Sequence, residues 1–202
     1  MLDWLELNLA DGAESGRKFI LTDHVYPGTR FFEEKMWHGD YTQRYFELLR
    51  NYAPQVALEV AGHEHITDIR YHSSHNVLDL DDPEEKFLFH NIFIAPGITP
   101  WYRQNPGVAL FEISDDCIPH SLKYEFINMM SFKGQSQLEF ADLTFKSLDL
   151  SAEYGLKDLT PEGIREFRKF LADPQNYDIA MNYLVSKLGF NPDDPDERQR
   201  VH

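Results

Sequence analysis

The sequence predicts an α/β protein: part of a layered β-sandwich with a mixed sheet, followed by a C-terminal helical tail. Early in the chain, two helix-like stretches alternate with two short apolar runs, 18–21 and 56–60. This alternation is typical of parallel strands covered by helices. Later, strand-like runs follow one another without a helix-length segment between them, which indicates mostly antiparallel hairpins. These runs are 66–71, 87–95, 108–113 and 122–129.

The helices of the first part are predicted from the spacing of their apolar residues and from their end signals. Residues 3–10 belong to the last turns of one helix, which the glycines at 12 and 16 end. Residues 39–52 carry aromatic and leucine side chains at helical spacing, and Pro54 stops this second helix. Each of these helices leads directly into one of the two apolar runs, as expected of a layered α/β domain.

The last third of the chain is predicted to be helical. Thr160 is the expected N-cap of one helix and Pro161 its first residue, because proline there loses no hydrogen bond. A second helix is expected over 177–188 and ends at Gly189. The side chains expected to face inward are Ile164, Phe167, Phe170 and Leu171 in the first helix, and Ala180, Met181, Tyr183, Leu184 and Leu188 in the second.

Composition bounds the function. The chain has 202 residues, 42% of them hydrophobic, and a net charge of −15. So acidic a chain is not expected to bind nucleic acid or an anionic membrane over a broad surface. A single cysteine, Cys117, excludes an intrachain disulfide. We expect no signal peptide and no transmembrane segment, since neither a basic leader nor an apolar run of about 18 to 20 residues is present.

Three short motifs carry the chemistry. The first is the Gly-His-Glu-His stretch over 62–65, directly after a buried strand. A glycine before two histidines lets the backbone turn so that both imidazoles point at one region. The second places His24 just beyond the preceding strand, ahead of Pro27 and Gly28. The third is the Ala-Pro-Gly-Ile-Thr-Pro stretch over 95–100, with Asn-Pro-Gly over 105–107 before a strand.

In this order the motifs resemble the C-terminal half of calcineurin-like metallophosphoesterases, and most closely their acid-sphingomyelinase-like phosphodiesterase group. The resemblance implies that His24 and His63 bind one divalent metal and that His65 binds a second, commonly zinc in this group. A metal pair of this kind cleaves phosphodiester bonds by polarising the phosphate and activating water. The resemblance also divides the chain into the C-terminal half of the phosphoesterase domain, a helical extension and a polar tail: 1–150, 151–190 and 191–202.

Other residues near the motifs have a functional and an ordinary interpretation. Asp23 and Glu64 could orient a metal-binding imidazole from the second shell, although we expect both to be exposed to solvent. Three residues beside the Thr-Pro turn could line a substrate site or take part in ordinary packing and surface contacts: Trp101, Tyr102 and Arg103. We assign no role in the site to the remaining histidines considered, namely His38, His72, His75, His90 and His120.

The chain departs from the family pattern in one respect. The Asp-x-His, Gly-Asp-x-x-Asp and Gly-Asn-His motifs that supply the other metal ligands are not found. Three imidazoles shared between two metals fall short of the four ligands of an ordinary zinc site. We therefore expect the chain alone to be inactive. Completed by the missing N-terminal half, it would be a metal-dependent phosphoric diester hydrolase.

The same departure predicts a partner. Without upstream strands, a hydrophobic parallel edge would lie open, and a second polypeptide or an upstream segment is expected to pair with it. Purified alone, the chain should be insoluble or molten. The alternative is a non-catalytic scaffold or accessory subunit of a larger assembly that retains the fold. The sequence does not determine the cellular compartment, although members of the group that the chain resembles are often lysosomal or secreted.

Overall fold

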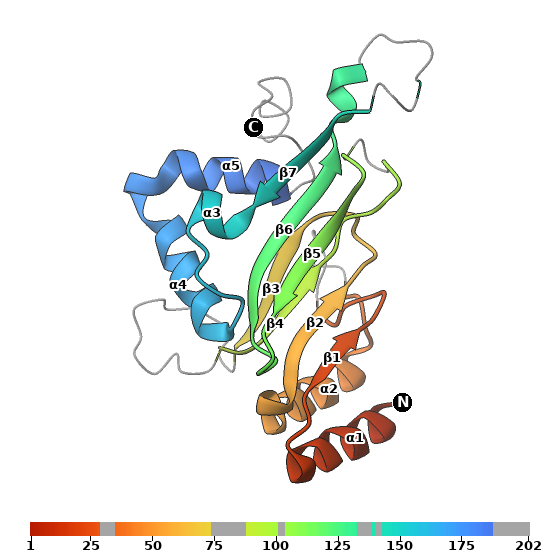
Figure 1. Cartoon of the computed structure of the whole chain (residues 1–202). Helices are drawn as coiled ribbons and strands as arrows, with labels where there is room; N and C mark the ends of the chain where they lie inside the picture. Colours follow the sequence, from red (N-terminus) through yellow and green to blue (C-terminus); the bar gives the residue numbers. More distant parts are fainter. Residues whose placement is uncertain (29–34, 74–87, 101–103, 133–138, 140–142, 188–202) are drawn as a thin grey trace.

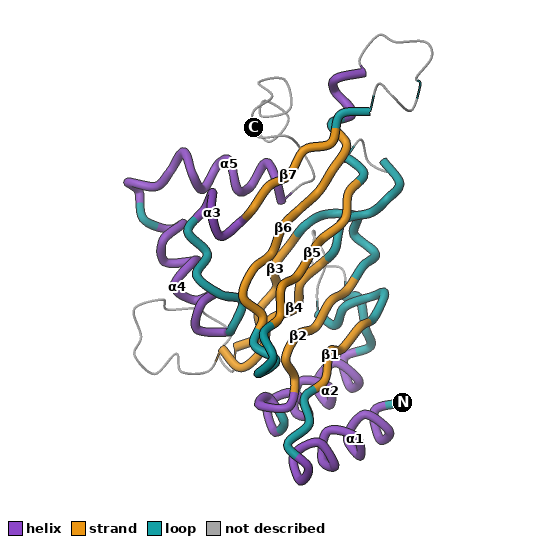
Figure 2. The backbone as a smooth tube through the Cα atoms, viewed as in Figure 1, coloured by secondary structure: helices purple, strands orange, loops and turns teal. Residues whose placement is uncertain are grey.

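The computed structural model describes residues 1–28, 35–73, 88–100, 104–132, 139 and 143–187 (Figure 1). The described helices and strands form two β-sheets with helices at two separate places on the molecule (Figure 2). In chain order they are α1 (Leu2–Ser15), β1 (Phe19–Thr22), α2 (Gly39–Asn51), β2 (Val56–Ala61), β3 (Asp68–Ser73), β4 (Leu88–Ile94), β5 (Gly107–Ile113), β6 (Pro119–Ile127), β7 (Phe145–Asp149), α3 (Leu150–Tyr154), α4 (Pro161–Ala172) and α5 (Tyr177–Lys187), with short 3₁₀ turns at Ala53–Gln55, Met129–Phe132 and Pro174–Asn176.

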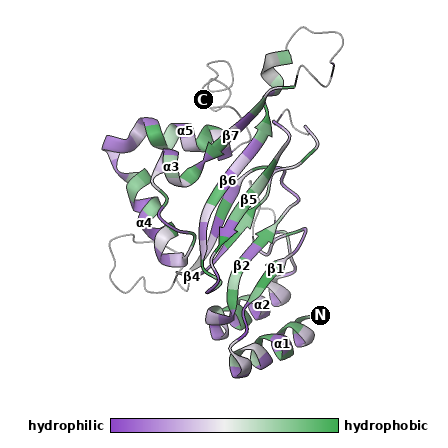
Figure 3. Ribbon diagram, viewed as in Figure 1, coloured by the Kyte–Doolittle hydropathy of each residue, from purple (hydrophilic) through white to green (hydrophobic). Residues whose placement is uncertain are grey.

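The first sheet has the strand order β1-β2-β4-β3. β1 pairs with β2 in parallel, β2 pairs with β4 in parallel, and β3 joins β4 in antiparallel fashion. The mixed sheet predicted from the sequence is confirmed. The later strands are not all antiparallel, however, because β4 crosses over to lie parallel to β2. Both β1 and β2 are hydrophobic along most of their length (Figure 3). The burial of β1 alternates along the strand, whereas β2 contains the buried residues Leu58, Glu59 and Ala61.

The second sheet is antiparallel, in the order β5-β6-β7. Its strands β5 and β6 correspond to the predicted runs 108–113 and 122–129. Strand β7 was not predicted, and the reason is its composition: of its five residues only Leu148 is buried. A strand with one buried side chain carries too weak an alternation to be recognised in the sequence.

The main hydrophobic core lies between the two sheets and includes the C-terminal helices. Leu58 and Phe93 come from the first sheet, and Leu122 and Tyr124 from the second. Side chains from α3, α4 and the segment between them complete the same cluster. They are Leu150, Tyr154, Leu156, Leu159, Ile164 and Phe167. The helical tail therefore packs into the core of the sandwich.

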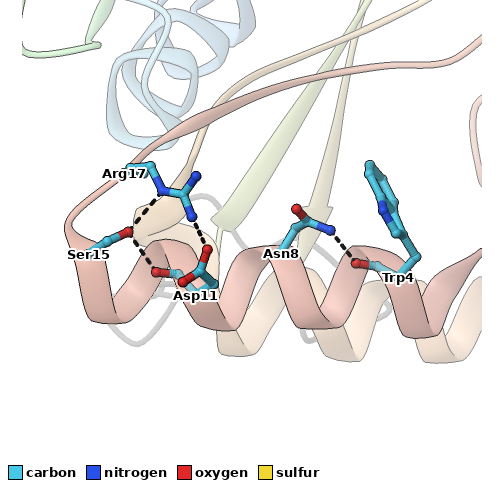
Figure 4. A network of polar contacts seen from close by, with 5 residues as sticks. All are labelled: Trp4, Asn8, Asp11, Ser15 and Arg17. Carbon is cyan, nitrogen blue, oxygen red and sulfur yellow. Dashed lines mark hydrogen bonds and ion pairs between the residues drawn. The ribbon is translucent and has the colours of Figure 1, made fainter.

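Helix α1 begins at Leu2 and runs to Ser15, longer than the predicted stretch. It ends at Gly16, whose φ of 72° is in the left-handed region that glycine adopts more readily than other residues. Polar contacts follow one side of the helix (Figure 4). The Asn8 side chain donates a hydrogen bond to the Trp4 carbonyl at 2.8 Å, and Arg17, just beyond the end of the helix, forms an ion pair with Asp11. α1 and α2 lie together at one end of the molecule, away from α3, α4 and α5 (Figure 1).

Helices α4 and α5 largely confirm the predicted tail. The Thr160 hydroxyl caps α4 by accepting a hydrogen bond from the Gly163 N–H at 3.2 Å. In α5 the predicted inward set is wrong in one place: Leu184 is 36% exposed, and its neighbour Val185 is buried instead. Leu188 and Gly189 lie outside the described residues. Within the part of the chain that is described, no helix is both long and apolar enough to cross a membrane.

A buried carboxylate fastens α5 to the first sheet. Asp68, at the start of β3, is 2% exposed. Its two oxygens pair with Arg70 at 2.6 Å and with Lys187, the last residue of α5, at 2.7 Å. The Lys187 carbonyl also accepts a hydrogen bond from the Thr67 N–H at 2.8 Å. The two cations offset the cost of burying the charge of this carboxylate.

Candidate metal-binding site

The three predicted histidines lie on two loops at one end of the first sheet. Because β1 and β2 are parallel, the residues that follow them, His24 and 62–65, share the same edge. Two backbone hydrogen bonds continue the pairing beyond the strands. The Asp23 N–H donates to the Val60 carbonyl at 3.2 Å, and the Gly62 N–H donates to the His24 carbonyl at 3.1 Å. The backbone itself thus holds the two loops together.

The imidazoles of His24 and His63 converge. Nε2 of His24 and Nδ1 of His63 are 3.4 Å apart, and the ring centroids are 5.2 Å apart with the planes at 85°. Tetrahedral zinc with nitrogen ligands at about 2.0–2.1 Å requires two such nitrogens about 3.3–3.4 Å apart. The pair therefore fits two ligand positions of one zinc ion. His24 is exposed and His63 half-buried, so the pair is accessible from solvent.

His63 and His65 owe their direction to an unusual backbone. Their φ angles are 75° and 58°, in the left-handed region that costs a non-glycine residue roughly 1–2 kcal/mol. We expected Gly62 to provide the tight turn, but its φ is not positive. A Cβ at position 62 would instead lie 3.4 Å from Nδ1 of His24. Gly62 thus lies against the His24 ring, while the positive φ angles of this turn belong to the histidines themselves.

His65 lies against the third motif. A Cβ on Gly97 would stand 2.6 Å from Cγ and Nδ1 of the His65 ring, closer than carbon atoms can pack. The Nδ1 atom of His65 is buried, and no hydrogen-bond partner for it is found among the described residues. Within those residues, no group of three or more His, Cys, Asp or Glu side chains is arranged to hold a metal. The structure therefore brings His24 and His63 together and leaves His65 beside the pair.

The Asn-Pro-Gly stretch of the third motif is structural in its described contacts. Oδ1 of Asn105 accepts a hydrogen bond from the Met129 N–H at 2.8 Å. The Gly107 N–H donates to the Gly97 carbonyl at 3.0 Å, which connects this turn to the residue that contacts His65. The motif thus helps to hold Gly97 in place against the His65 ring. Trp101, Tyr102 and Arg103, predicted as weak substrate contacts, lie outside the described residues.

The two carboxylates that could orient an imidazole, Asp23 and Glu64, are not exposed, contrary to expectation. Glu64 is buried, and its Oε1 accepts a hydrogen bond from the Tyr26 hydroxyl at 3.5 Å. Asp23 is half-buried, and burial followed by the charge of Glu59 raises its pKa to about 7.

Sequence reasoning missed a buried polar cluster beneath the site. Glu59 in β2 is fully buried and pairs with Nε2 of His90 in β4, a histidine to which no role was assigned. Tyr45 of α2 is also buried there, and burial followed by the charge of Glu59 raises its pKa well above the usual range. The only signal in the sequence is one acid in the otherwise apolar run over 56–61.

A mixed α/β sandwich with converging histidines at the carboxyl ends of parallel strands is the arrangement expected for one half of a metallophosphoesterase domain. The particular group that the chain resembles is the acid-sphingomyelinase-like phosphodiesterases, and sequence comparisons confirm this resemblance. No protein-family model matches the chain.

Three curated relatives illustrate the similarity. Human "Acid sphingomyelinase-like phosphodiesterase 3b" is 31% identical over 110 residues, which cover 52% of this chain and 22% of the relative. "Sphingomyelinase phosphodiesterase C" of Dictyostelium discoideum is 27% identical over 124 residues, 54% of this chain and 26% of the relative. "Sphingomyelin phosphodiesterase 2" of Caenorhabditis elegans is 28% identical over 112 residues, 55% and 16% respectively. The match thus spans no more than about a quarter of these relatives.

Proposed function

We propose that this chain is part of a metal-dependent phosphodiesterase of the sphingomyelinase-like type. His24 and His63 hold one divalent cation, and His65 contributes to a second. The observation that carries the proposal is the 3.4 Å separation of the His24 and His63 ring nitrogens at the carboxyl ends of two parallel strands. Imidazole nitrogen is a suitable ligand for zinc, as it is for copper, iron and nickel. The names of the relatives support phosphodiester cleavage.

The chain's own residues would hold and orient the cation. A bound metal supplies a Lewis acid for the phosphate and lowers the pKa of bound water. His24 and His63 must be neutral to donate their lone pairs, so binding releases any proton they carry. The exposed position of His24 leaves the outer side of the pair open to a substrate phosphate.

Further ligands are proposed to come from outside this chain. Two converging nitrogens are half of the four ligands of a tetrahedral site, and the matched stretch is a minor part of each relative. β1 is the last described strand on its side of the first sheet, and Ile20 within it is 53% exposed. An additional strand from a second polypeptide or an upstream segment would cover this edge and deliver the other ligands beside His24.

Zinc binding to the 202-residue chain tests the ligand pair. We expect His24→Ala and His63→Ala each to weaken zinc affinity at least about tenfold, about 1.4 kcal/mol, as measured by calorimetry. His120→Ala is the matched control, because His120 is exposed on β6 of the other sheet. Equal affinities for wild type and both site variants would contradict the proposal.

Hydrolysis of bis(p-nitrophenyl) phosphate tests the activity. The chain alone should be inactive, whereas a preparation that includes the polypeptide carrying the remaining ligands should hydrolyse it. His63→Ala in that preparation should abolish turnover. A stable complex that holds no metal and hydrolyses nothing would instead support the alternative, a non-catalytic subunit that keeps the phosphoesterase fold.

A further inference from the structure

Tyr26 lies two residues after His24, on the loop that follows β1, but its side chain takes the opposite direction. His24 is exposed, whereas Tyr26 is 1% exposed. The tyrosine thus carries a polar hydroxyl into the interior, where such a group usually has a hydrogen-bond partner. The contacts of this hydroxyl and of the ring therefore indicate what Tyr26 does beside the candidate site.

The Tyr26 hydroxyl reaches the loop that carries the other two histidines. It donates a hydrogen bond to Oε1 of Glu64 at 3.5 Å. Glu64 is 5% exposed and stands at the centre of residues 62–65, the histidine turn. The bond is long, but both groups are buried, and a hydrogen bond is stronger in the interior than in water. A side-chain contact thus joins the His24 loop to the histidine turn.

The Tyr26 ring is packed with the residues that flank the same turn. Ala61 directly precedes the histidine turn and Ile66 directly follows it. Both belong, with Tyr26, to one buried hydrophobic cluster, which also includes two isoleucines of β4. The entry and the exit of the turn therefore share a packed environment with the tyrosine whose hydroxyl contacts its centre.

The ring itself is held by charged residues of β3 and α5. The guanidinium carbon of Arg70 is 5.4 Å from the centroid of the Tyr26 ring, within the range of a cation–π contact. Arg70 pairs with Asp68 at 2.6 Å, and Asp68 pairs with Lys187 of α5 at 2.7 Å. Tyr26 is thus connected to the rigid part of the first sheet and to the C-terminal helix.

The histidine turn requires support of this kind. His63 and His65 have φ angles of 75° and 58°, and such conformations persist in residues other than glycine only where the surrounding structure determines them. Within the turn, the Glu64 N–H donates to the Gly62 carbonyl at 3.0 Å. A contact to the Glu64 side chain acts on the residue between the two strained histidines, so it bears directly on the direction of both rings.

We propose that Tyr26 is a positioning residue: it holds the histidine turn so that the ring nitrogen of His63 lies 3.4 Å from that of His24. The hydroxyl acts through Glu64, and the ring acts through the cluster that it shares with both ends of the turn. The proposal rests on the function proposed above, because the histidine pair is its cation site. Tyr26 itself does not touch the cation.

The test begins with two substitutions of Glu64 in the 202-residue chain. Glu64→Gln keeps an oxygen that accepts from the Tyr26 hydroxyl, whereas Glu64→Met does not. Both remove the charge, so the difference between them reports the hydrogen bond alone. Loss of a group that orients metal ligands commonly reduces metal affinity about 10- to 100-fold, and we expect zinc to bind Glu64→Gln about tenfold more tightly than Glu64→Met by calorimetry. Equal affinities would overturn the proposal.

Tyr26→Phe is then introduced into each of these variants, which completes a double-mutant cycle. In the Glu64→Gln background it should weaken zinc binding about tenfold, because an acceptor loses its donor. In the Glu64→Met background no hydrogen bond is left to remove, and the affinity should change less than about twofold on the same scale. Equal losses in both backgrounds would show that the hydroxyl does not act through Glu64. If Glu64→Met does not fold, Glu64→Ala takes its place.

A second tyrosine provides the matched control. Tyr154 is 3% exposed, and its hydroxyl donates to the Ser186 hydroxyl at 3.5 Å, but its ring lies in the main core. Tyr154→Phe is the same chemical change at the same hydrogen-bond length. It should lower the melting temperature and leave zinc affinity unchanged. A loss of zinc affinity in Tyr154→Phe equal to that in Tyr26→Phe would mean general destabilisation and refute a specific role.

The metal-free protein separates this proposal from the proposed function. We expect a nuclear Overhauser effect between ring protons of His24 and His63 in wild type and in Glu64→Gln, and its loss in Tyr26→Phe. If the ring contact behaves so but no zinc binding depends on His24, the proposed function fails and the positioning role stands. If zinc binding depends on both histidines but Tyr26→Phe changes neither the ring contact nor the affinity, the metal site stands and Tyr26 has no positioning role.

Discussion

In the first sheet, three parallel strands end beside the histidines, and the face toward α2 buries charged and polar side chains around Glu59. In the second sheet, three antiparallel strands present apolar residues such as Leu122 and Tyr124 to the main core. The carboxyl ends of parallel strands meet at one edge of a sheet, where binding sites commonly lie. Antiparallel strands can instead be joined by short hairpins. The candidate site thus lies on the first sheet alone, whereas both sheets contribute to the main core.

The largest expected effect comes from the core side of the second sheet. Leu122→Ala should lower the free energy of unfolding by about 2–5 kcal/mol, because it leaves a cavity in the main cluster. Val108→Ala on the exposed face of the adjacent β5 is the control and should change it by less than about 1 kcal/mol. Urea denaturation measures both. A small effect of Leu122→Ala would mean that the second sheet contributes little to stability.

A smaller effect is expected where the third motif meets the site. Gly97→Ala would place a methyl group 2.6 Å from the His65 ring, so the ring must move, at about 1–3 kcal/mol. Crystallography or the imidazole NMR signals of His65 would detect the shift. Gly39→Ala, where a Cβ meets nothing within 4 Å, is the control. An unmoved His65 ring would show that this contact does not determine its position.

The pH dependence of stability reports on the polar face of the first sheet. Asp23 has a pKa of about 7 in the folded chain against 3.8 for the ordinary carboxyl. Between about pH 4 and 7 the folded state keeps a proton that the unfolded state releases, so stability falls as pH rises through this window. Asp23→Asn should remove that part of the slope. The difference is on the order of 1 kcal/mol, since solvent screens a half-exposed group.

The smallest effect on stability is expected at the edge of β1. Ile20→Lys replaces an exposed apolar side chain and should change the unfolding free energy by no more than about 0.5 kcal/mol. It should reduce self-association markedly, because a charged edge resists strand addition. Light scattering measures this. A wild-type chain that is monomeric and melts sharply would contradict the prediction of an open, reactive edge.

The sequence sufficed for elements whose own composition determines them. The apolar run over 56–60 became β2, and Thr160 with Pro161 started α4. Local sequence did not suffice to predict elements whose structure depends on contacts with residues far away in the chain. Strand β7 buries a single side chain, and the parallel pairing of β4 with β2 depends on a crossover that local pattern does not encode.

The site divides in the same way. The order of motifs identified His24 and His63, and their convergence followed from parallel strands that end together. The left-handed backbone at His63 and the burial of Glu59 could not be anticipated. A positive φ is uncommon for any residue other than glycine, even for histidine, which is enriched there. A lone acid in a strand is ordinarily expected to face water.

The backbone at positions 63 and 65 bears on how this chain would respond to selection for stability. Glycine adopts such φ angles without steric penalty, so we expect replacement of either histidine by glycine to relieve strain and to raise the melting temperature. A stabilised chain obtained in that way would lose an imidazole from the site. At these two positions, stability and the metal binding proposed above are therefore expected to trade against each other.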